Sequence, residues 1–488
     1  AGNTVSGTAA DLLSVDRTQP SVHSIQSSVP WARAGTVVSI SADVSDNFGL
    51  DGLPTLRLNG NLVAVFPAVA GSLHTWTFTV GASEMQGAAA IEVAAVDRSG
   101  NARTASPSST ILTVDRTQPN IGSLTVSPAA ARVGTAVTLT AQVIDNYGIS
   151  GTPLMTVNGL PVPAPSQSGY LYTWVFTVPS GVSEGPAAIA IYASDLAGNA
   201  RNFSNNTALT LDPNPPQVTG ITASPTQARA GNAVVFSATI TDLTGVSGSP
   251  SLTVNGVAAA HAGASGGVHT WNFTVPAGAP EGNATVRVTA ADTLGNSAVT
   301  TSTSALLIDR TAPVISNVQA VPAVAKLGDS VRLVFAVTDA LTGVFGTPSV
   351  TVNAASAAFH SQSGTVYEFR YTVRAADPEG PASVLISSRD VVGNGGIVTL
   401  TSALTIDNTV PTVSGLSVYP EHAGDGVSVL IGFRVNDSNG IPSPPSVKVN
   451  GLDAVFSTSE DGYYEYTFTV RHGEVAEGPA TVSIVAVD

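Results

Sequence analysis

Three aspartates recur at fixed spacing along the chain, and together they could hold a metal ion. A linker Asp is followed 30 residues later by a loop Asp, and a turn Asp comes 50 or 51 residues after that. Carboxylates that lie close together repel one another unless a cation sits among them. Ca²⁺ takes about 6–8 such oxygen ligands in flexible geometry. The spacing therefore predicts calcium sites at five sets: Asp16, Asp46 and Asp97; Asp115, Asp145 and Asp195; Asp212, Asp242 and Asp292; Asp309, Asp339 and Asp390; Asp407, Asp437 and Asp488.

Two interpretations of these aspartates without a metal stay open. Asp caps turns by accepting hydrogen bonds from nearby backbone N–H groups, and D-x-x-G is a good turn sequence by itself. This explains the loop and turn Asp better than the linker Asp, after which no Gly turn follows. The linker Asp could instead pair with the arginine that follows it in three sets, although other residues stand there in the remaining two. These arginines are Arg17, Arg116 and Arg310.

A glutamate also recurs in a later turn of most sets. We expect it at the opposite pole of its domain, near the next junction, where it either adds a ligand or is a plain surface residue. Its positions are Glu184, Glu281, Glu379 and Glu477.

The aspartates are set in an internal repeat of about 98 residues. The string Val-Asp-Arg-Thr-Gln-Pro at 15–20 returns at 114–119, and the linker Asp positions are 99, 97, 97 and 98 residues apart. Each repeat contains short Val- and Thr-rich runs with period 2 and many turn residues, which is typical of strands. About seven strands fit in one repeat, the number that an immunoglobulin-like (Ig-like) sandwich needs. We therefore predict an all-β fold, a tandem array of five Ig-like β-sandwich domains.

The strands of the first repeat illustrate why the aspartates should meet. Strands are expected near 22–26, 36–44 and 76–80, with a hairpin turn at Asn59-Gly60, a pair that tolerates positive φ. In an up-and-down sandwich, the entry of the domain and the two loops that carry the other aspartates lie at one pole. All three carboxylates should therefore converge where one repeat meets the previous one.

Domain boundaries follow from the linker Asp. We predict repeat 1 at 16–114, repeat 2 at 115–211, repeat 3 at 212–308, repeat 4 at 309–406 and repeat 5 at 407–488, the last without its final strand. Residues 1–15 match a final strand. They belong either to a preceding repeat of a longer array or to a strand donated to the fifth repeat of a neighbouring subunit, which would build a fibre.

Composition excludes several functional classes. The formal net charge is −15 and no basic stripe exists, which argues against nucleic acid as a partner. The chain has no cysteine and no long apolar run, so neither thiol chemistry nor direct membrane insertion is expected. Seven histidines are scattered over different repeat positions, and no catalytic motif is visible, so we expect no enzyme. Only His74 and His269 share a repeat position, and both are predicted on the strand surface.

The V-D-x-T-x-P linker, the D-x-x-G loop and the D-x-x-G-N turn resemble the bacterial Ig-like domains of large repetitive surface adhesins. The resemblance covers the whole chain and implies a stalk or extension module, sometimes calcium-stiffened. We expect an extracellular or cell-surface stalk or fibre whose partners are further copies of the repeat, with surface glycans or proteins as possible ligands. The alternatives are a self-polymerising subunit joined by strand donation, and glycan- or protein-binding accessory repeats of a larger secreted protein or hydrolase.

Overall fold

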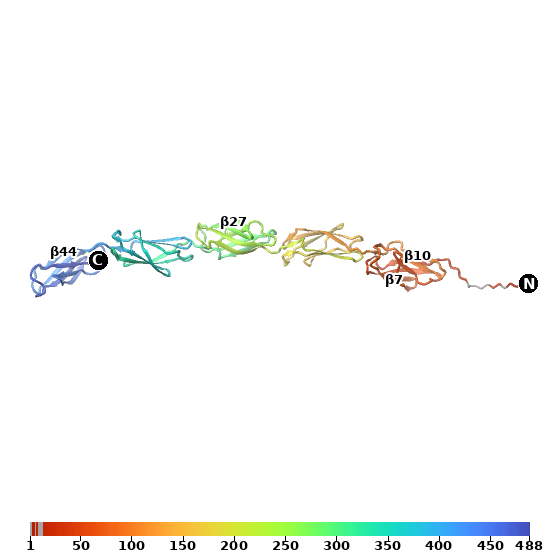
Figure 1. Ribbon diagram of the computed structural model, residues 1–488, viewed down its shortest axis with the longest axis horizontal. Helices are drawn as coiled ribbons and strands as arrows, with labels where there is room; N and C mark the ends of the chain where they lie inside the picture. The colour runs from red at the N-terminus through yellow and green to blue at the C-terminus, as the bar shows by residue number, and fades with distance from the viewer. Residues whose placement is uncertain (1, 5, 8–12) are drawn as a thin grey trace. The chain divides into compact units, whose positions relative to one another are not determined.

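The regular structure of this chain consists of β-strands joined by turns (Figure 1). The computed structural model describes residues 2–4, 6, 7 and 13–488, and no helix occurs among them. None of these residues therefore forms a helix that could cross a membrane. The predicted all-β array of Ig-like sandwiches is confirmed. The final strand predicted over 1–15 lies in part outside the described residues, and the described ones there have no regular secondary structure.

Repeat 2 shows how one domain is built. The first sheet has the order β12 (Asn120–Ser127), β14 (Ala136–Ile144), β18 (Leu171–Thr177) and β17 (Ser166–Ser168). The second sheet has the order β16 (Leu160–Pro161), β15 (Leu154–Val157), β20 (Ile189–Ser194) and β21 (Ala200–Asn205). A short third sheet joins β13 (Ala130–Ala131), β22 (Thr210–Leu211) and β19 (Gly185–Pro186), with β13 and β22 parallel. Pro128 separates β12 from β13, because proline has no N–H to donate to a ladder.

Repeats 1 and 4 have the same three sheets. In repeat 1 they are β1 (Ser21–Ser27), β3 (Val37–Ser45), β7 (Leu73–Thr79) and β6 (Ala68–Ala70); β10 (Ala102–Ala105), β9 (Ile91–Val96), β4 (Thr55–Leu58) and β5 (Asn61–Leu62); and β2 (Trp31–Ala32), β11 (Thr113–Val114) and β8 (Gly87–Ala88). In repeat 4 they are β33 (Val314–Val321), β35 (Ser330–Thr338), β39 (Val366–Thr372) and β38 (Ala358–Ser363); β37 (Ala355–Ser356), β36 (Ser349–Val352), β41 (Val384–Arg389) and β42 (Gly395–Leu400); and β34 (Val324–Ala325), β43 (Thr405–Ile406) and β40 (Gly380–Pro381).

Repeats 3 and 5 depart from this pattern: in repeat 3 the long strand β27 (Val257–Ser265) joins the two main sheets into one sheet, and the described residues of repeat 5 form no third short sheet. Repeat 3 has β23 (Gln217–Ser224), β24 (Gln227–Ala228), β25 (Ala233–Thr241), β26 (Ser251–Val254), β27 (Val257–Ser265), β28 (Val268–Thr274), β29 (Gly282–Asn283), β30 (Val286–Ala291), β31 (Ser297–Ser302) and β32 (Leu307–Ile308). Repeat 5 has one sheet of β44 (Thr412–Tyr419), β45 (Ser428–Asn436), β49 (Tyr463–Thr469) and β48 (Val455–Glu460), and another of β47 (Leu452–Asp453), β46 (Ser446–Val449) and β50 (Val482–Val485).

The predicted Asn-Gly hairpin turn has the expected backbone conformation. Asn59 and Gly60 have φ of 54° and 81°. Repeat 4 keeps the same turn with Asn353 and Ala354, at φ of 45° and 65°. Because an alanine in this left-handed region costs about 1–2 kcal/mol, the flanking strands must hold the turn in place.

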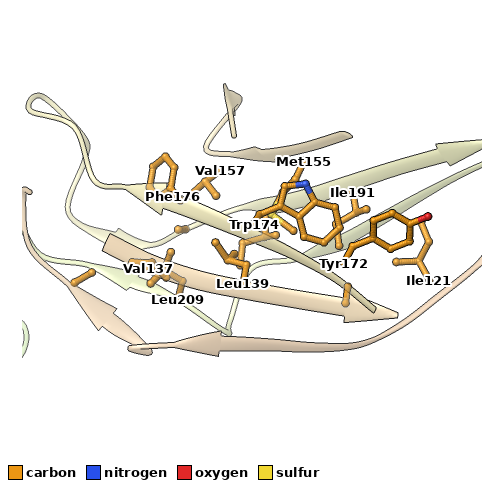
Figure 2. Packing of buried hydrophobic residues seen from close by; sticks show 14 of the residues in the cluster. Ile121, Val137, Leu139, Met155, Val157, Tyr172, Trp174, Phe176, Ile191 and Leu209 are labelled. Carbon is orange, nitrogen blue, oxygen red and sulfur yellow. The ribbon is translucent and has the colours of Figure 1, made fainter. Parts of the chain in front are cut away.

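Alternating side chains of the two main sheets form the core of each domain, as repeat 2 shows (Figure 2). Tyr172, Trp174 and Phe176 lie at every second position of β18 and are all buried. Trp174 is in register with Leu139 of β14, and its ring centroid lies 6.0 Å from that of Tyr172. Truncating a buried aromatic residue of this size to alanine typically costs about 3–5 kcal/mol. The loops at the pole project from this packed core.

The prediction for the two histidines at the shared position was wrong. His74 and His269 are only 4% and 7% exposed, and each ring stacks on a tryptophan of the same strand. They precede that tryptophan by two residues, so period 2 places them on the same inward face. Repeat 2 has the buried Tyr172 at this position, which confirms that the position belongs to the core.

Candidate metal centres

The structure brings four of the five predicted aspartate sets together. In each of these sets, one carboxylate oxygen from each residue lies within 4.8 Å of the others. The four sets are Asp16, Asp46 and Asp97; Asp115, Asp145 and Asp195; Asp212, Asp242 and Asp292; Asp309, Asp339 and Asp390. Among the described residues the fifth set, with Asp407 and Asp437, does not meet this distance, and Asp488 lies 3.3 Å from the Lys326 ammonium. A role as metal ligands stays a prediction for all five sets.

The backbone explains why the three residues of a set converge. In repeat 2, the linker Asp115 directly follows β11, the loop Asp145 follows β14, and the turn Asp195 follows β20. The Asp115 N–H donates to the Ala32 carbonyl at 2.9 Å, which ties the linker to the preceding repeat. An isolated bridge between Ile149 and Asp195 holds the loop against the turn. Equivalent bridges occur in repeats 1, 3 and 4.

The turn Asp has hydrogen-bond donors for both of its oxygens. In repeat 2, Asp195 Oδ1 accepts from the Asn199 backbone N–H at 2.8 Å, and Oδ2 accepts from Asn199 Nδ2 at 2.7 Å. Asn199 Nδ2 also donates to the Asp115 carbonyl at 3.1 Å, so this amide joins the turn to the linker. The same contacts recur in the other three sets through Asn101, Asn296 and Asn394. Sequence reasoning missed these asparagines, although the D-x-x-G-N motif contains them.

Turn chemistry accounts for one oxygen of the linker Asp and one of the loop Asp. Asp145 Oδ1 accepts from the Tyr147 N–H at 2.9 Å, which is an ordinary Asx-type cap. Asp115 Oδ1 accepts from the Thr117 N–H at 3.0 Å, although no glycine turn follows. The interpretation without metal is therefore sound for the Oδ1 atoms, including that of the linker Asp.

The second oxygens behave differently. Asp115 Oδ2 and Asp145 Oδ2 are buried and have no hydrogen-bond donor among the described residues, and Asp16 Oδ2 and Asp46 Oδ2 of repeat 1 share this condition. Asp115 as a whole is 0% exposed. Burying a charged oxygen without a partner is costly, so a buried anion is normally paired or bound to a metal. Because no turn hydrogen bond reaches these Oδ2 atoms, they are suited to bind a cation.

Crowding of like charges is visible in the loop aspartates. Burial raises the pKa of Asp145, the Tyr147 N–H opposes this, and the charges of Asp115 and Asp195 raise it further. The pKa of Asp242 is raised in the same way by burial and by the charges of Asp212 and Asp292, against the hydrogen bonds from Thr244. A cation among these carboxylates would relieve the repulsion.

The recurring glutamate lies near the next junction, as the sequence predicted. Glu281 Oε1 accepts from the Arg310 N–H at 2.9 Å, and Glu379 Oε2 accepts from the Asn408 N–H at 2.8 Å. Glu184 also lines a groove of about 370 Å³ together with Asp242. Its side chain therefore stands beside the acidic set of the next repeat.

The arginines that follow the linker Asp do not pair with it. Among the described residues, Arg116 Nη1 donates to the Glu84 carbonyl at 3.3 Å, and Arg310 Nη1 donates to the Ala279 carbonyl at 2.9 Å. Both arginines thus contact the preceding repeat. The linker carboxylates obtain no counter-charge from them.

Strand order and core together define a tandem array of Ig-like β-sandwich repeats. Residues 267–358 match the family model of the bacterial Ig-like domain (group 3). The match begins in repeat 3 and ends in repeat 4, so it includes Asp292, Asp309 and Asp339. The chain thus resembles the bacterial Ig-like repeats, and the matched family is one of Ig-like domains, not of enzymes. No curated protein matches the chain.

Several solved structures of repeat arrays are similar to the chain at low identity. A Ca²⁺-stabilised adhesin that helps an Antarctic bacterium reach out and bind ice is 19% identical, covering 81% of this chain and 100% of that one, with a TM-score of 0.36. A tetra-tandem repeat from the extending region of a large adhesion protein is 21% identical, covering 78% and 99%, with a TM-score of 0.34. The fold of the chain is shown by its own strand order.

Proposed function

We propose that the chain is part of an extracellular stalk on a bacterial surface, in which calcium bound at each acidic set stiffens the connection between consecutive repeats. The observation that carries the proposal is the buried, donor-less Oδ2 of Asp115 and Asp145 within a converged set. The family match supports a bacterial repeat domain. The acidic chain, with a net charge of −15, suits a secreted protein whose partners are further copies of the repeat.

The donor set favours calcium over other metals. Each set offers carboxylate oxygens only, and zinc prefers the nitrogen and sulfur ligands of His and Cys. Mg²⁺ demands near-ideal octahedral geometry, whereas Ca²⁺ accepts an irregular shell of oxygens. In the sets of repeats 1 and 2 the linker and loop aspartates would supply the orphaned Oδ2 atoms, while Asn101 and Asn199 hold the turn Asp in place. Extracellular sites of this kind bind calcium at roughly 10⁻⁴–10⁻³ M.

A cation at this place would act on the connection itself. Asp115 belongs to the segment between two repeats, whereas Asp145 and Asp195 belong to the body of the second repeat. A calcium ion that binds all three therefore ties the connecting segment to the domain that follows. Bending at the connection then requires breaking metal–oxygen contacts.

Calcium titration of the whole chain after chelation tests the proposal. Isothermal titration should give about four sites, one for each converged set, with dissociation constants near those of extracellular modules. A variant with asparagine at the four loop positions should lose this binding: Asp46→Asn, Asp145→Asn, Asp242→Asn and Asp339→Asn. The matched control removes four exposed carboxylates elsewhere: Asp51→Asn, Asp425→Asn, Asp453→Asn and Asp461→Asn. Absence of saturable binding, or equal loss in both variants, contradicts the proposal.

Chelation should also change the dimensions of the chain in solution. Small-angle scattering is expected to show a more flexible array without calcium, because the connecting segments are then less restrained. If the chain binds calcium but its dimensions do not change on chelation, the stiffening role is contradicted and only the calcium binding stands.

A further inference from the structure

A basic residue stands at one fixed position in four of the five repeats. It comes 17 residues after the linker Asp, and repeat 5 has Gly424 there instead. The four residues are Arg33, Arg132, Arg229 and Lys326. None of them belongs to the acidic sets, and neither the family match nor the calcium proposal gives them a role.

The local backbone holds this residue in a defined place. In repeat 2, Arg132 directly follows the short strand β13, and its carbonyl accepts from the Thr135 N–H at 3.1 Å to close a tight turn. The preceding Ala131 carbonyl accepts from the Asp212 N–H of the linker at 3.0 Å. The base of the side chain is thus fixed beside the start of the next repeat.

The side chain reaches the D-x-x-G-N turn of that next repeat. Arg132 Nη1 donates to the Gly295 carbonyl at 2.8 Å, and this glycine lies between the turn Asp292 and Asn296. The guanidinium also lies close to the α-carbon of Gly295, because a Cβ added to this glycine would lie 3.5 Å from Arg132 Nη1.

The same approach recurs at the other junctions. A Cβ added to the turn Gly198 would lie 3.8 Å from Arg33 Nε, and one added to Gly393 would lie 3.6 Å from Arg229 Nε. Lys326 Nζ lies 3.3 Å from Oδ1 of the turn Asp488. Three arginines at one repeat position therefore meet the same turn of the following repeat, and Lys326 meets the aspartate at the corresponding place.

The chemistry of the turn suits a guanidinium. The turn glycine has a positive φ, +88° at Gly295, which an L side chain rarely adopts, so this position presents only backbone to the arginine. The turn also carries a buried aspartate, and hydrogen bonds that involve a charged donor are stronger than neutral ones. Arginine is always charged and offers five N–H donors, so it can hold the carbonyl without any metal.

We propose that this basic residue is a junction latch: Arg33, Arg132 and Arg229 bind the D-x-x-G-N turn of the next repeat, Lys326 binds the aspartate at the start of the corresponding segment, and the contact restrains the connection independently of any cation. The partner that this surface fits is the next copy of the repeat. The junction would then have two separate restraints, a metal-dependent one at the acidic set and a protein-only one at the latch. Raising ionic strength should weaken the latch, because its donor is charged and exposed.

The test uses the full chain in the presence of a chelator, so that the calcium proposal does not enter the result. Because the chain has no cysteine, spin labels can be placed at the exposed positions Val175 and Val235 through two introduced cysteines. Arg132→Gln should broaden the distance distribution between the labels. It should also speed amide exchange in the turn at 292–296 by about three- to tenfold, the effect of losing one hydrogen bond of ordinary net strength.

Two further variants make the outcome decisive. Arg201→Gln removes the same charge from the exposed strand β21 of repeat 2 and should change neither measurement. Arg132→Lys should keep both the label distances and the exchange rates close to those of the unsubstituted chain, because Lys326 already occupies this position in repeat 4. Unchanged distances and exchange in Arg132→Gln, with the near-ultraviolet spectrum of the folded chain retained, would overturn the latch. Equal changes in Arg201→Gln would show a general charge effect and overturn it as well.

Discussion

The acidic sets of repeats 2 and 3 have aspartates at the same three repeat positions, but the hydrogen-bond donors to these aspartates differ. In repeat 2 the loop reads Asp-Asn-Tyr-Gly, and Asp115 Oδ2 is buried without a donor among the described residues. In repeat 3 the loop reads Asp-Leu-Thr-Gly, and the Thr244 hydroxyl donates to Asp212 Oδ2 at 2.8 Å. Repeat 4 follows repeat 3, because Thr342 Oγ1 donates to Asp309 Oδ2 at 2.6 Å. One loop residue therefore decides whether the Oδ2 atom of the linker Asp has a hydrogen-bond donor.

The side chain contributed by the preceding repeat also differs between the two sites. Gln86 stands beside the set of repeat 2, and its Nε2 donates to Asp115 Oδ1 at 3.2 Å. Glu184 stands at the corresponding place beside the set of repeat 3, where its Oε2 accepts from Asn214 Nδ2. The site of repeat 2 thus has a neutral neighbour and an orphaned oxygen, whereas the site of repeat 3 has an acidic neighbour and an internal hydrogen bond.

The largest effect should come from the turn Asp, which the two sites share. Asp195→Ala and Asp292→Ala each remove the acceptor for two donors of one asparagine, at about 1–3 kcal/mol per buried unpaired group. Without calcium both repeats should therefore lose roughly 3 kcal/mol, and with calcium the loss should be larger because a ligand of the ion is also removed. Native-state hydrogen exchange of β20 and β30 in the full chain measures this loss. A marked inequality between the two variants would mean that the sites differ at the turn as well.

Calcium should stabilise the loop of repeat 2 more than the loop of repeat 3. A ligand at one hundred times its dissociation constant stabilises the folded state by about 2.7 kcal/mol. At repeat 3 the cation must compete with the Thr244 hydroxyl for Asp212 Oδ2, which should reduce the gain by about 1 kcal/mol. Amide exchange of the loops at 145–148 and 242–245, followed with calcium and with chelator, gives both gains from one sample. Equal stabilisation of the two loops by calcium would mean that the Thr244 hydroxyl does not affect calcium binding.

Removing the threonine hydroxyl should convert one site into the other. Thr244→Val leaves Asp212 Oδ2 without its donor, so without calcium repeat 3 should lose about 1–2 kcal/mol. With calcium most of this loss should disappear, because the cation takes the place of the hydroxyl. Thr301→Val on the exposed strand β31 changes the same atoms away from the site and serves as the control. A loss that is the same with and without calcium would indicate a packing defect instead.

The features predicted from the sequence are those that every repeat shares. The fixed spacing of Asp115, Asp145 and Asp195 indicated convergence, because strands with period 2 and short turns place the two loops and the entry at one pole. The partners that distinguish one site from another could not be predicted this way. Thr244 stands in a loop position where repeats 1 and 2 have an aromatic residue, and its role depends on a contact of a few ångströms.

Contacts between repeats could not be predicted from the sequence, for a different reason. Arg132 and its acceptor Gly295 are 163 residues apart, and no local pattern connects them. The error at His74 had a local cause, since counting two positions back from Trp76 would have placed it in the core. Periodicity within a strand is therefore a safer guide to burial than the polarity of a single residue.

The smallest expected effect, and the most specific one, concerns the neighbour from the preceding repeat. Gln86→Glu replaces a donor to Asp115 Oδ1 with a further carboxylate, so the junction should weaken without calcium and bind calcium a few-fold more tightly. Glu184→Gln makes the reverse change beside repeat 3 and should weaken calcium binding there by a similar factor. Loop-resolved calcium titrations by hydrogen exchange measure both, and high ionic strength should shrink both shifts because the added charge acts through solvent-accessible space. Opposite shifts in the two variants would show that the preceding repeat tunes the site electrostatically, whereas shifts of the same sign would mean that these residues act through packing of the junction.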